Sequence, residues 1–326
     1  MCTAIAKRFT DSYFGRTLDY DHVYPFQPVM TPRRFRHCFR HMDSPAVSYA
    51  ILGMGMPSDG VPLFFDGVNE KGVFAAGLLF ENNAVYRKPL AGMDNIPSFA
   101  VIPWLLSHCG CLQEVRTALT RINIVDTAFR EDLPPSPLHW FISDGEHSLV
   151  VESLADGIQI HDNPAGVLTN NPPFPLQMFH LTQYMGLSPY PAENRFADGM
   201  AFSPYSRGMG ALGLPGDGTS PSRFVRAAFV GHNTLSGTSE EENVGQIFHI
   251  MTSVEQQKGC VRLENGGMSH TQYISCTNGS RGIYYYTTYH NRRITAVDMW
   301  AEDMDSENMI LFPLGECEDI LYQNRG

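Results

Sequence analysis

The sequence predicts an α+β fold in which antiparallel sheets pack together and carry helices on their outer faces. Strand-like runs are grouped in the first half of the chain and again near its end, and helical patterns are grouped between them. Turn signals join neighbouring strand-like runs, as expected for antiparallel pairing. Strands in runs and helices in runs are typical of this fold class.

The first two strands are predicted to form a hairpin. Residues 2–9 and 13–18 are strand-like, and turn residues separate them. The hairpin places Cys2 at the start of a strand. Asn278 and Gly279 begin a strong turn signal between two later strands. The further strand-like runs are residues 47–52, 73–80, 138–143, 149–152, 157–161, 273–277, 283–289 and 294–300.

The helical patterns begin at recognisable caps. Ser220 followed by Pro221 is typical of an N-cap with proline at the first helical position. Thr238 through Glu241 fit a capping box. No internal repeat or linker-like stretch divides the chain, so we expect one continuous domain over residues 1–326. The helical patterns cover residues 99–107, 112–122, 177–184, 220–229 and about 240–254.

Composition and charge exclude several classes of protein. The 326 residues include 34 acidic and 23 basic side chains, and the net charge of -11 disfavours a nucleic-acid partner or an anionic membrane surface. No run approaches the roughly 20 apolar residues of a membrane span. Lys7 and Arg8 interrupt any signal-peptide pattern, so we expect a cytoplasmic protein. Seven scattered cysteines do not indicate a disulfide framework.

Cys2 carries the strongest indication of chemistry. It follows the initiator Met1, so removal of Met1 would leave one residue with both a thiol and a free α-amine. A thiol needs a base or a lowered pKa to attack. An N-terminal amine, with a reference pKa of about 7.7–8.0, can be that base near neutral pH. The alternative is that Cys2 is a small apolar residue opening the first strand.

Arg16 and Asp19 lie on the strand antiparallel to the one that Cys2 begins, so we expect both to return close to Cys2. An arginine there favours the thiolate, and an aspartate orients the protonated amine. The alternative is an ordinary surface ion pair, which contributes little to stability.

We expect no cofactor and no metal ion. Residues 208–213 match the spacing G-x-G-x-x-G, but they lack the preceding strand and following helix that a dinucleotide site needs. The motifs of phosphate-binding loops, zinc proteases and serine hydrolases are missing from the sequence. The 12 histidines show no metal-ligand spacing.

Six segments resemble the choloylglycine hydrolase family, which contains bile salt hydrolases and penicillin V acylases. They occur in the family's order and span nearly the whole chain. The resemblance implies an N-terminal-nucleophile hydrolase fold, a four-layer αββα sandwich, and hydrolysis of a linear amide. The segments are residues 1–3 (MCT), 14–19 (FGRTLD), 168–172 (LTNNP), 205–210 (YSRGMG), 212–217 (LGLPGD) and 222–226 (SRFVR).

The resemblance also implies a role for each matched residue. Cys2 would be the nucleophile and its freed amine the base, while Arg16 and Asp19 tune and orient them. Asn170 matches the family residue whose side-chain amide helps bind the oxyanion. Arg223 matches the second arginine of the site.

Leu79 departs from the family pattern. Its backbone N–H matches the second oxyanion donor, but bile salt hydrolases typically carry asparagine at this position and penicillin V acylases tyrosine. An apolar leucine neither recognises nor rejects a polar head group in the usual way. The preference between the two substrate classes therefore stays open at this position.

Aromatic and methionine side chains occur in segments that resemble the family's pocket loops. Such a lining suits a sterol-like or aromatic acyl group. The alternative is that most of them fill the core. The residues are Tyr20, Tyr24, Phe26, Met56, Phe65 and Phe129, with Met54 and Phe64 in the same segments.

These observations predict a homotetrameric amidohydrolase that removes glycine or taurine from conjugated bile salts. The block from Ser206 to Phe224 favours bile salts over penicillin V, and residues 188–218 resemble the loop with which the family assembles its tetramer. Four alternatives stay open: a penicillin V acylase, an acyltransferase to amines, a glutaminase module, and a binding protein with an inert Cys2. Thr3 argues against the glutaminase, because those chains usually carry glycine there.

Overall fold

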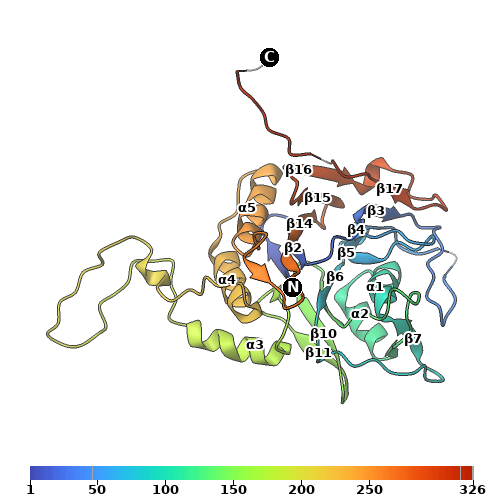
Figure 1. Cartoon of the computed structure of the whole chain (residues 1–326), viewed down its shortest axis with the longest axis horizontal. Coiled ribbons are helices and arrows are strands. Elements are labelled where there is room, and N and C mark those ends of the chain that lie inside the picture. The colour runs from blue at the N-terminus through green and yellow to red at the C-terminus, as the bar shows by residue number, and fades with distance from the viewer. Residues whose placement is uncertain (46, 316, 325–326) are drawn as a thin grey trace.

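The computed structural model describes residues 1–45, 47–315 and 317–324 (Figure 1). Two antiparallel sheets pack together, and helices cover the outer side of each. The predicted α+β class and its four-layer αββα arrangement are therefore confirmed. None of the described helices is both long enough and apolar enough to cross a membrane.

The first sheet has seven strands and contains both strands of the predicted hairpin. β1 (Cys2–Arg8) and β2 (Ser12–Tyr20) pair in a register that places Cys2 opposite Leu18 and Ala4 opposite Arg16. β13 (Val261–Arg262) pairs with β14 (Met268–Asn278) beside the main path. Along that path the order is β12 (Val167–Leu168), β1 (Cys2–Arg8), β2 (Ser12–Tyr20), β14 (Met268–Asn278), β15 (Ile283–Thr288) and β16 (Asn291–Asp298).

The second sheet has eight strands, and a separate parallel pair lies beside it. The pair is β7 (Asp94–Pro97) with β8 (Ile122–Val125). The order of the second sheet is β11 (Gly157–Asp162), β10 (Ser148–Leu154), β9 (Leu138–Ser143), β6 (Phe74–Leu79), β5 (Phe64–Asn69), β4 (Ile51–Gly55), β3 (Gln27–Thr31) and β17 (Ile310–Leu311).

The helices divide between the two sheets. α4 (Ser220–Asn233) packs on β1 and β12, α5 (Glu240–Thr252) on β2 and β14, and α1 (Val101–His108) on β5 and β6. Figure 1 shows α4 and α5 on one side of the molecule and α1 and α2 on the other, with the strands between them. The helices are α1 (Val101–His108), α2 (Leu112–Leu119), α3 (Phe174–Leu181), α4 (Ser220–Asn233) and α5 (Glu240–Thr252), with short 3₁₀ segments η1 (Ser98–Ala100), η2 (Thr182–Tyr184), η3 (Met209–Ala211) and η4 (Met299–Ala301).

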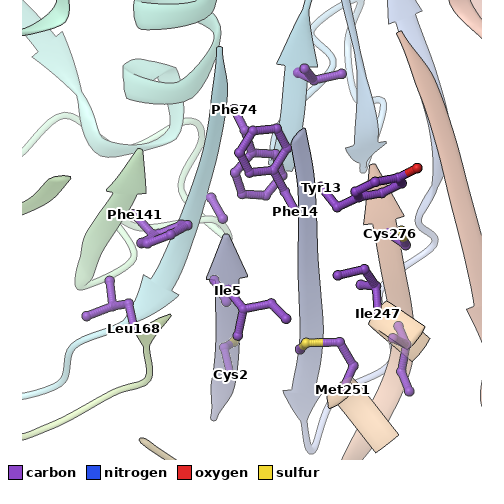
Figure 2. Close-up of a cluster of buried hydrophobic side chains, with 14 of the residues drawn as sticks. Cys2, Ile5, Tyr13, Phe14, Phe74, Phe141, Leu168, Ile247, Met251 and Cys276 are labelled. Carbon is purple, nitrogen blue, oxygen red and sulfur yellow. The ribbon is translucent and has the colours of Figure 1, made fainter. Parts of the chain in front are cut away.

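β2 alternates its side chains between the two faces of its sheet. Phe14 points toward the second sheet and stacks on Phe74 of β6, with ring centroids 4.8 Å apart and planes at 3° (Figure 2). Gly15 points the other way, where a Cβ would lie 2.9 Å from the side chain of Met251 on α5. The even-numbered positions of β2 therefore face the gap between the sheets, and the odd-numbered positions face the helices.

Several predicted boundaries were wrong by a few residues. The strand expected over 47–52 begins at Ile51. The helix expected over 112–122 ends at Leu119, because Thr120 and Arg121 form a turn and Ile122 begins β8. The N-cap of α4 is Thr219, one residue before the expected Ser220.

The predicted capping box of α5 is shifted by one residue. Ser239 is the N-cap and accepts a hydrogen bond from Glu242 N at 3.3 Å, whereas the prediction used Thr238 and Glu241. Glu242 in turn accepts from the Thr238 hydroxyl at 2.8 Å. The type of cap was therefore correct, and its position was not.

The 188–218 loop has little regular structure beyond η3. Figure 1 shows it reaching away from the body between α3 and α4. Its base is closed by a hydrogen bond from Ser188 N to Gly210 O at 2.8 Å. Tyr190, Phe196 and Tyr205 are between 74% and 83% exposed, so the loop presents aromatic rings to its surroundings.

Candidate active site

Cys2 lines a cavity between the two sheets and is 3% exposed. Met1 is attached, so the Cys2 nitrogen is a peptide amide here, and it donates to Asn170 Oδ1 at 2.7 Å. Asp19 N donates to Met1 O at 2.8 Å, and the Met1 amine donates to Asp19 O. These bonds extend the hairpin by one residue and hold the terminus of β1 in place.

Arg16 is the cation beside the Cys2 thiol. In the pairing of β1 with β2, Arg16 lies opposite Ala4, two residues along β1 from Cys2, so both side chains are on the same face of the sheet. Arg16 Nη2 lies 3.6 Å from Cys2 Sγ. Nη2 also donates to Gly77 O at 2.9 Å. Burial acts to lower the pKa of Arg16, but Tyr273, Cys2 and Asp66 outweigh it and raise the pKa above its ordinary value. A permanently charged guanidinium therefore faces the sulfur.

Asp19 lies on the opposite face of β2 from Arg16, because their positions differ by an odd number. Its Oδ1 accepts from the Thr271 hydroxyl at 2.6 Å and its Oδ2 from the Thr17 hydroxyl at 3.2 Å. Arg223 Nη1 lies 4.0 Å from Oδ2. Asp19 is thus near the backbone of Cys2 and Met1, not beside the thiol.

Asn170 lies in the segment between β12 and α3, and both ends of its side-chain amide are engaged. Oδ1 accepts from Cys2 N and from Arg223 Nη2, each at 2.7 Å. Nδ2 donates to Leu79 O at 2.8 Å. An amide NH₂ has two hydrogens, so Nδ2 keeps one further donor for a group in the site.

Arg223 of α4 ties β1 to the Asn170 segment and is completely buried. Nη1 donates to Cys2 O at 2.6 Å and to the Thr3 hydroxyl at 2.7 Å, while Nη2 binds Asn170 Oδ1. Burial lowers the pKa of Arg223. Because it binds on the far side of β1 from the sulfur, Arg223 orients Asn170 and the Cys2 backbone.

The cavity contains about 920 Å³ of empty space, including the part that opens to solvent. Cys2 and Arg16 are at its polar part, and its other walls are mostly apolar and aromatic. This is typical of a small-molecule site with a few polar groups placed at the reacting end. Of the residues expected to form the pocket, the structure places Tyr20, Tyr24, Met56, Phe65 and Phe129 on its wall, together with Leu79 and Phe64.

Phe26 does not line this cavity. Its ring packs against Tyr273, with centroids 5.2 Å apart, and borders a separate surface hollow near His270 and His290. Met54 is buried in the core between the sheets. The expectation that these two residues form the pocket wall is therefore corrected.

Wall residues that the sequence reasoning missed come from several segments. Those in loops carry no periodic pattern that would orient a side chain toward the cavity, and the others lie in η1 or at the start of β9. They are Leu63, Ser98, Phe99, Leu133, Pro134, Ser136 and Leu138.

Two buried acidic residues near the site were also missed. Asp66 binds Arg16, and Glu152 accepts from Phe174 N at 2.9 Å and lies 3.2 Å from His139 Nδ1. Each interrupts an apolar strand sequence, FFDGVN and VVESL respectively. Because a buried charge must be paired, such an interruption is the signal that could have found them.

His139 connects Glu152 to the Asn170 segment. Its Nε2 lies 2.8 Å from Thr169 O, which can only accept, so Nε2 carries a proton. In the described part of the chain, no group of three or more His, Cys, Asp or Glu side chains is arranged to hold a metal ion.

Comparison with protein families finds one model that matches residues 2–312. Its description is linear amide C–N hydrolases, choloylglycine hydrolase family. The matched range includes Cys2, Arg16, Asp19, Asn170 and Arg223.

Two curated relatives are named bile salt hydrolase/transferase. The one from Lactiplantibacillus plantarum is 44% identical over 314 residues, which cover 96% of this chain and 97% of the relative. The one from Clostridium perfringens is 36% identical over 331 residues, covering 99% of this chain and all of the relative.

Solved structures show the same architecture. A cysteine-to-alanine variant of the conjugated bile acid hydrolase from Clostridium perfringens superposes with a TM-score of 0.91 at 34% identity, covering 99% of this chain and all of that one. Penicillin V acylase from Agrobacterium tumefaciens has a TM-score of 0.77 at 20% identity, covering 97% and 92% of the two chains. At that identity the second likeness shows the fold alone.

Proposed function

The chain belongs to the choloylglycine hydrolase family and is a hydrolase of linear amide C–N bonds, and we propose that it removes the amino acid from conjugated bile salts through Cys2. The observation that carries the proposal is the position of the Cys2 thiol. It faces Arg16 at 3.6 Å and opens on a cavity with an apolar wall. The names of the relatives supply the substrate class.

The first step is attack on the amide. After removal of Met1, the Cys2 amine takes the thiol proton, and the thiolate attacks the carbonyl carbon. The C–N bond then breaks, and the ammonium returns its proton to the departing nitrogen. This step releases the free amino acid and leaves an acyl thioester on Cys2.

The second step is hydrolysis of that thioester. The Cys2 amine accepts a proton from water, and the hydroxide attacks the thioester carbonyl. The C–S bond breaks, the acid leaves, and the thiol is restored. Asp19 is close to the terminus through its backbone bonds with Met1, which suits it to orient the amine.

In both steps, Asn170 Nδ2 and the backbone N–H of Leu79 are assigned as the hydrogen-bond donors that bind the oxyanion. Phe80 N donates to Pro137 O, so the alternation of an antiparallel ladder turns the Leu79 N–H away from β9. The bond from Asn170 Nδ2 to Leu79 O keeps the two groups adjacent.

The experiment is a comparison of unmodified protein with Cys2→Ala on glycocholate, taurocholate and penicillin V. We expect release of glycine or taurine by the unmodified protein and none by Cys2→Ala. Cys260→Ala, which changes an exposed cysteine away from the cavity, is the matched control. Hydrolysis by Cys2→Ala, or active protein that retains Met1, would overturn the proposed mechanism, and a much larger rate on penicillin V would overturn the substrate class.

A second activity of the same site is transfer of the acyl group to an amine. The names of the two relatives include both hydrolase and transferase. Any amine that reaches the thioester can replace water as the attacking group. Incubation with cholate conjugates and excess free amino acids should yield new amides, and their absence across such a panel would remove this activity.

Assembly into a homotetramer through the 188–218 loop is part of the proposal. The loop's exposed aromatic rings and its reach away from the body support it. The cytoplasmic location and the choice between glycine and taurine stay predictions.

A further inference from the structure

We infer that Asp66 is a positioning residue for Arg16, and that its carboxylate sets both the orientation of that guanidinium and the net charge beside the Cys2 thiol. The inference rests on the proposed role of Cys2 as nucleophile. Asp66 lies outside the six segments that resemble the family, so nothing in that resemblance assigns it.

The Asp66–Arg16 pair crosses the interface between the two sheets. Asp66 is on β5 and Arg16 on β2, and Nη1 lies 3.2 Å from Asp66 Oδ2. Tyr273 of β14 accepts from the same Nη1 at 3.1 Å and donates its own proton to Asp66 Oδ2. Tyr284 of β15 donates to Asp66 Oδ1 at 2.7 Å. Both carboxylate oxygens are thus bound, which fixes the plane in which Arg16 must lie.

In this arrangement one terminal nitrogen of Arg16 makes structural bonds and the other faces the site. Nη1 is held by Asp66 and Tyr273, whereas Nη2 faces Gly77 O and Cys2 Sγ. The fork of a guanidinium is planar, so fixing Nη1 fixes the direction of Nη2. Without its anchor, a side chain with many rotamers would keep its charge beside the thiol but lose the fixed orientation of Nη2.

Asp66 also supplies the negative charge of this cluster. Arg16 and Asp66 are 1% and 0% exposed, so solvent screens their interaction poorly. Burial raises the pKa of Tyr273 and of Tyr284 well above the ordinary value, so both phenols stay neutral donors. The thiol therefore faces an ion pair, not an isolated cation.

The remaining charged groups around Cys2 balance one another. Asp19 and Arg223 lie on the helix side of β1 and β2, with 4.0 Å between their charged atoms. Loss of the Asp66 charge would leave Arg16 uncompensated, and an uncompensated cation favours the thiolate. The titratable and charged groups that face Cys2 or its immediate backbone are Arg16, Asp19, Tyr20, Tyr24, Arg223, Tyr273 and the amine freed on removal of Met1.

The experiment measures alkylation of Cys2 by iodoacetamide as a function of pH, followed by mass spectrometry of the N-terminal peptide. Asp66→Asn keeps the shape of the side chain and removes its charge. We expect the pH of half-maximal alkylation to move down by about 1 unit. We also expect kcat on the conjugated bile salt to fall at least tenfold while KM changes little, because Arg16 loses its anchor but the cavity wall is intact.

Glu240→Gln is the matched control. Glu240 accepts from Tyr285 at 2.7 Å and pairs with Arg281 at 2.6 Å, so like Asp66 it is bound by a tyrosine and an arginine, here nearer the surface. It lies near the other end of β2, where Asn278 pairs with Tyr13, away from Cys2. Glu240→Gln should therefore leave the alkylation profile and kcat unchanged.

Tyr273→Phe separates orientation from charge. It removes the hydroxyl that bonds both Arg16 and Asp66 but keeps both charges, so kcat should fall without a comparable shift of the alkylation profile. If Asp66→Asn does not fold, the kcat of Tyr273→Phe tests the inference in its place. An unchanged or raised alkylation midpoint in Asp66→Asn, or full kcat in Tyr273→Phe, would overturn the inference. Because alkylation needs no bile salt, a wrong substrate class would leave this readout intact.

Discussion

At the scale of single residues, the polar side chains around Cys2 are held in place by hydrogen bonds from several elements. Asn170 shows this best, since its carbonyl oxygen serves the Cys2 nitrogen and Arg223 while its amide nitrogen points to Leu79. A flipped amide would place a donor against two donors. The network therefore selects one orientation of Asn170, and in that orientation Nδ2 lies beside Leu79 O with one N–H left for a further acceptor.

Asn170→Ala should lower kcat by about 10²–10³ and change KM little, because an oxyanion donor acts mainly in the transition state. Steady-state hydrolysis of the conjugated bile salt measures both constants. Asn171→Ala, which changes the neighbouring amide that binds Glu81 O, should keep kcat close to that of the unmodified protein. A large rise in KM with normal kcat would instead assign Asn170 to substrate binding.

His37 is a second residue whose surroundings dictate a measurable property. It packs between Phe35 and Phe39, and neither ring nitrogen has a hydrogen-bond partner among the described residues. Burial, with a smaller effect of His108, lowers the pKa of His37 to about 3. An unfolded chain returns this pKa to about 6.5. Below pH 6.5 the unfolded state therefore binds more protons, and stability falls as the pH falls toward 3.

His37→Phe should remove this acid sensitivity. At pH 7 the variant should be about as stable as the unmodified protein, because a phenyl ring suits the aromatic contacts and buries no unpaired nitrogen. At pH 5 the variant should be more stable by about 2 kcal/mol. Urea unfolding at the two pH values measures the difference, and parallel losses of stability in both proteins would contradict it.

The residues of the site were only partly predictable from the sequence. The hairpin correctly brought Arg16 and Asp19 back toward Cys2, but the period of two places them on opposite faces of β2. Phe26 was misassigned because the segment after β2 is a loop, and no periodicity orients a side chain there. Asp66 was missed because its partner is 50 residues away in the chain.

At the scale of elements, long alternating strands were predictable and interrupted strands were not. β9 was predicted to the residue, and β1, β2 and β6 nearly so. β5 was missed because Asp66 and Gly67 break its apolar run. β3 was missed because it contains Pro28, a residue depleted in strands, which is tolerated next to the two-residue strand β17.

Gly53 of β4 shows how closely the strands behind Asp66 approach. A Cβ at Gly53 would lie 2.1 Å from the backbone oxygen of Asp66 and 2.5 Å from Gly67 Cα. Only backbone lies on that side, so a rotamer change cannot relieve the clash. Gly53→Ala should lower the free energy of unfolding by about 3 kcal/mol.

Gly245→Ala is the opposite case within the same chain. Gly245 is inside α5, and a Cβ there meets no atom within 4 Å. The substitution should raise the free energy of unfolding by about 0.5–1 kcal/mol, because alanine loses less backbone entropy in a helix. Denaturant unfolding of both variants tests the pair, and a stable Gly53→Ala would show that β4 and β5 can separate without cost.

At the scale of the whole molecule, the two sheets contribute different parts of one site. Cys2 and Arg16 come from the seven-stranded sheet, while Asp66 and Leu79 come from the eight-stranded one. The site therefore exists only when the sheets pack together. The sequence identifies Cys2, Arg16 and Leu79, whereas three-dimensional pairing is needed to find Asp66.

The two arms of the 188–218 loop, its outgoing and returning parts, are in contact at the base of the loop. The loop can therefore be shortened, which tests how whole molecules assemble. Ser188 bonds Gly210, and a Cβ at Gly210 would lie 2.0 Å from Tyr190 O, so the arms are in contact there. Residues 192–207 can therefore be replaced by two glycines without stretching the chain. The deletion removes Phe196, Met200, Phe202 and Tyr205, all exposed, and leaves the core unchanged.

Since the removed side chains pack on nothing in the buried core, the shortened protein should unfold at nearly the same denaturant concentration as the full chain. If the loop joins copies of the chain, the mass in solution should fall from that of four chains toward one or two. Light scattering after gel filtration measures that mass. A shortened protein that keeps the mass of four chains would show that other surfaces hold the tetramer, and a full-length protein that is already a single chain would remove the proposed assembly.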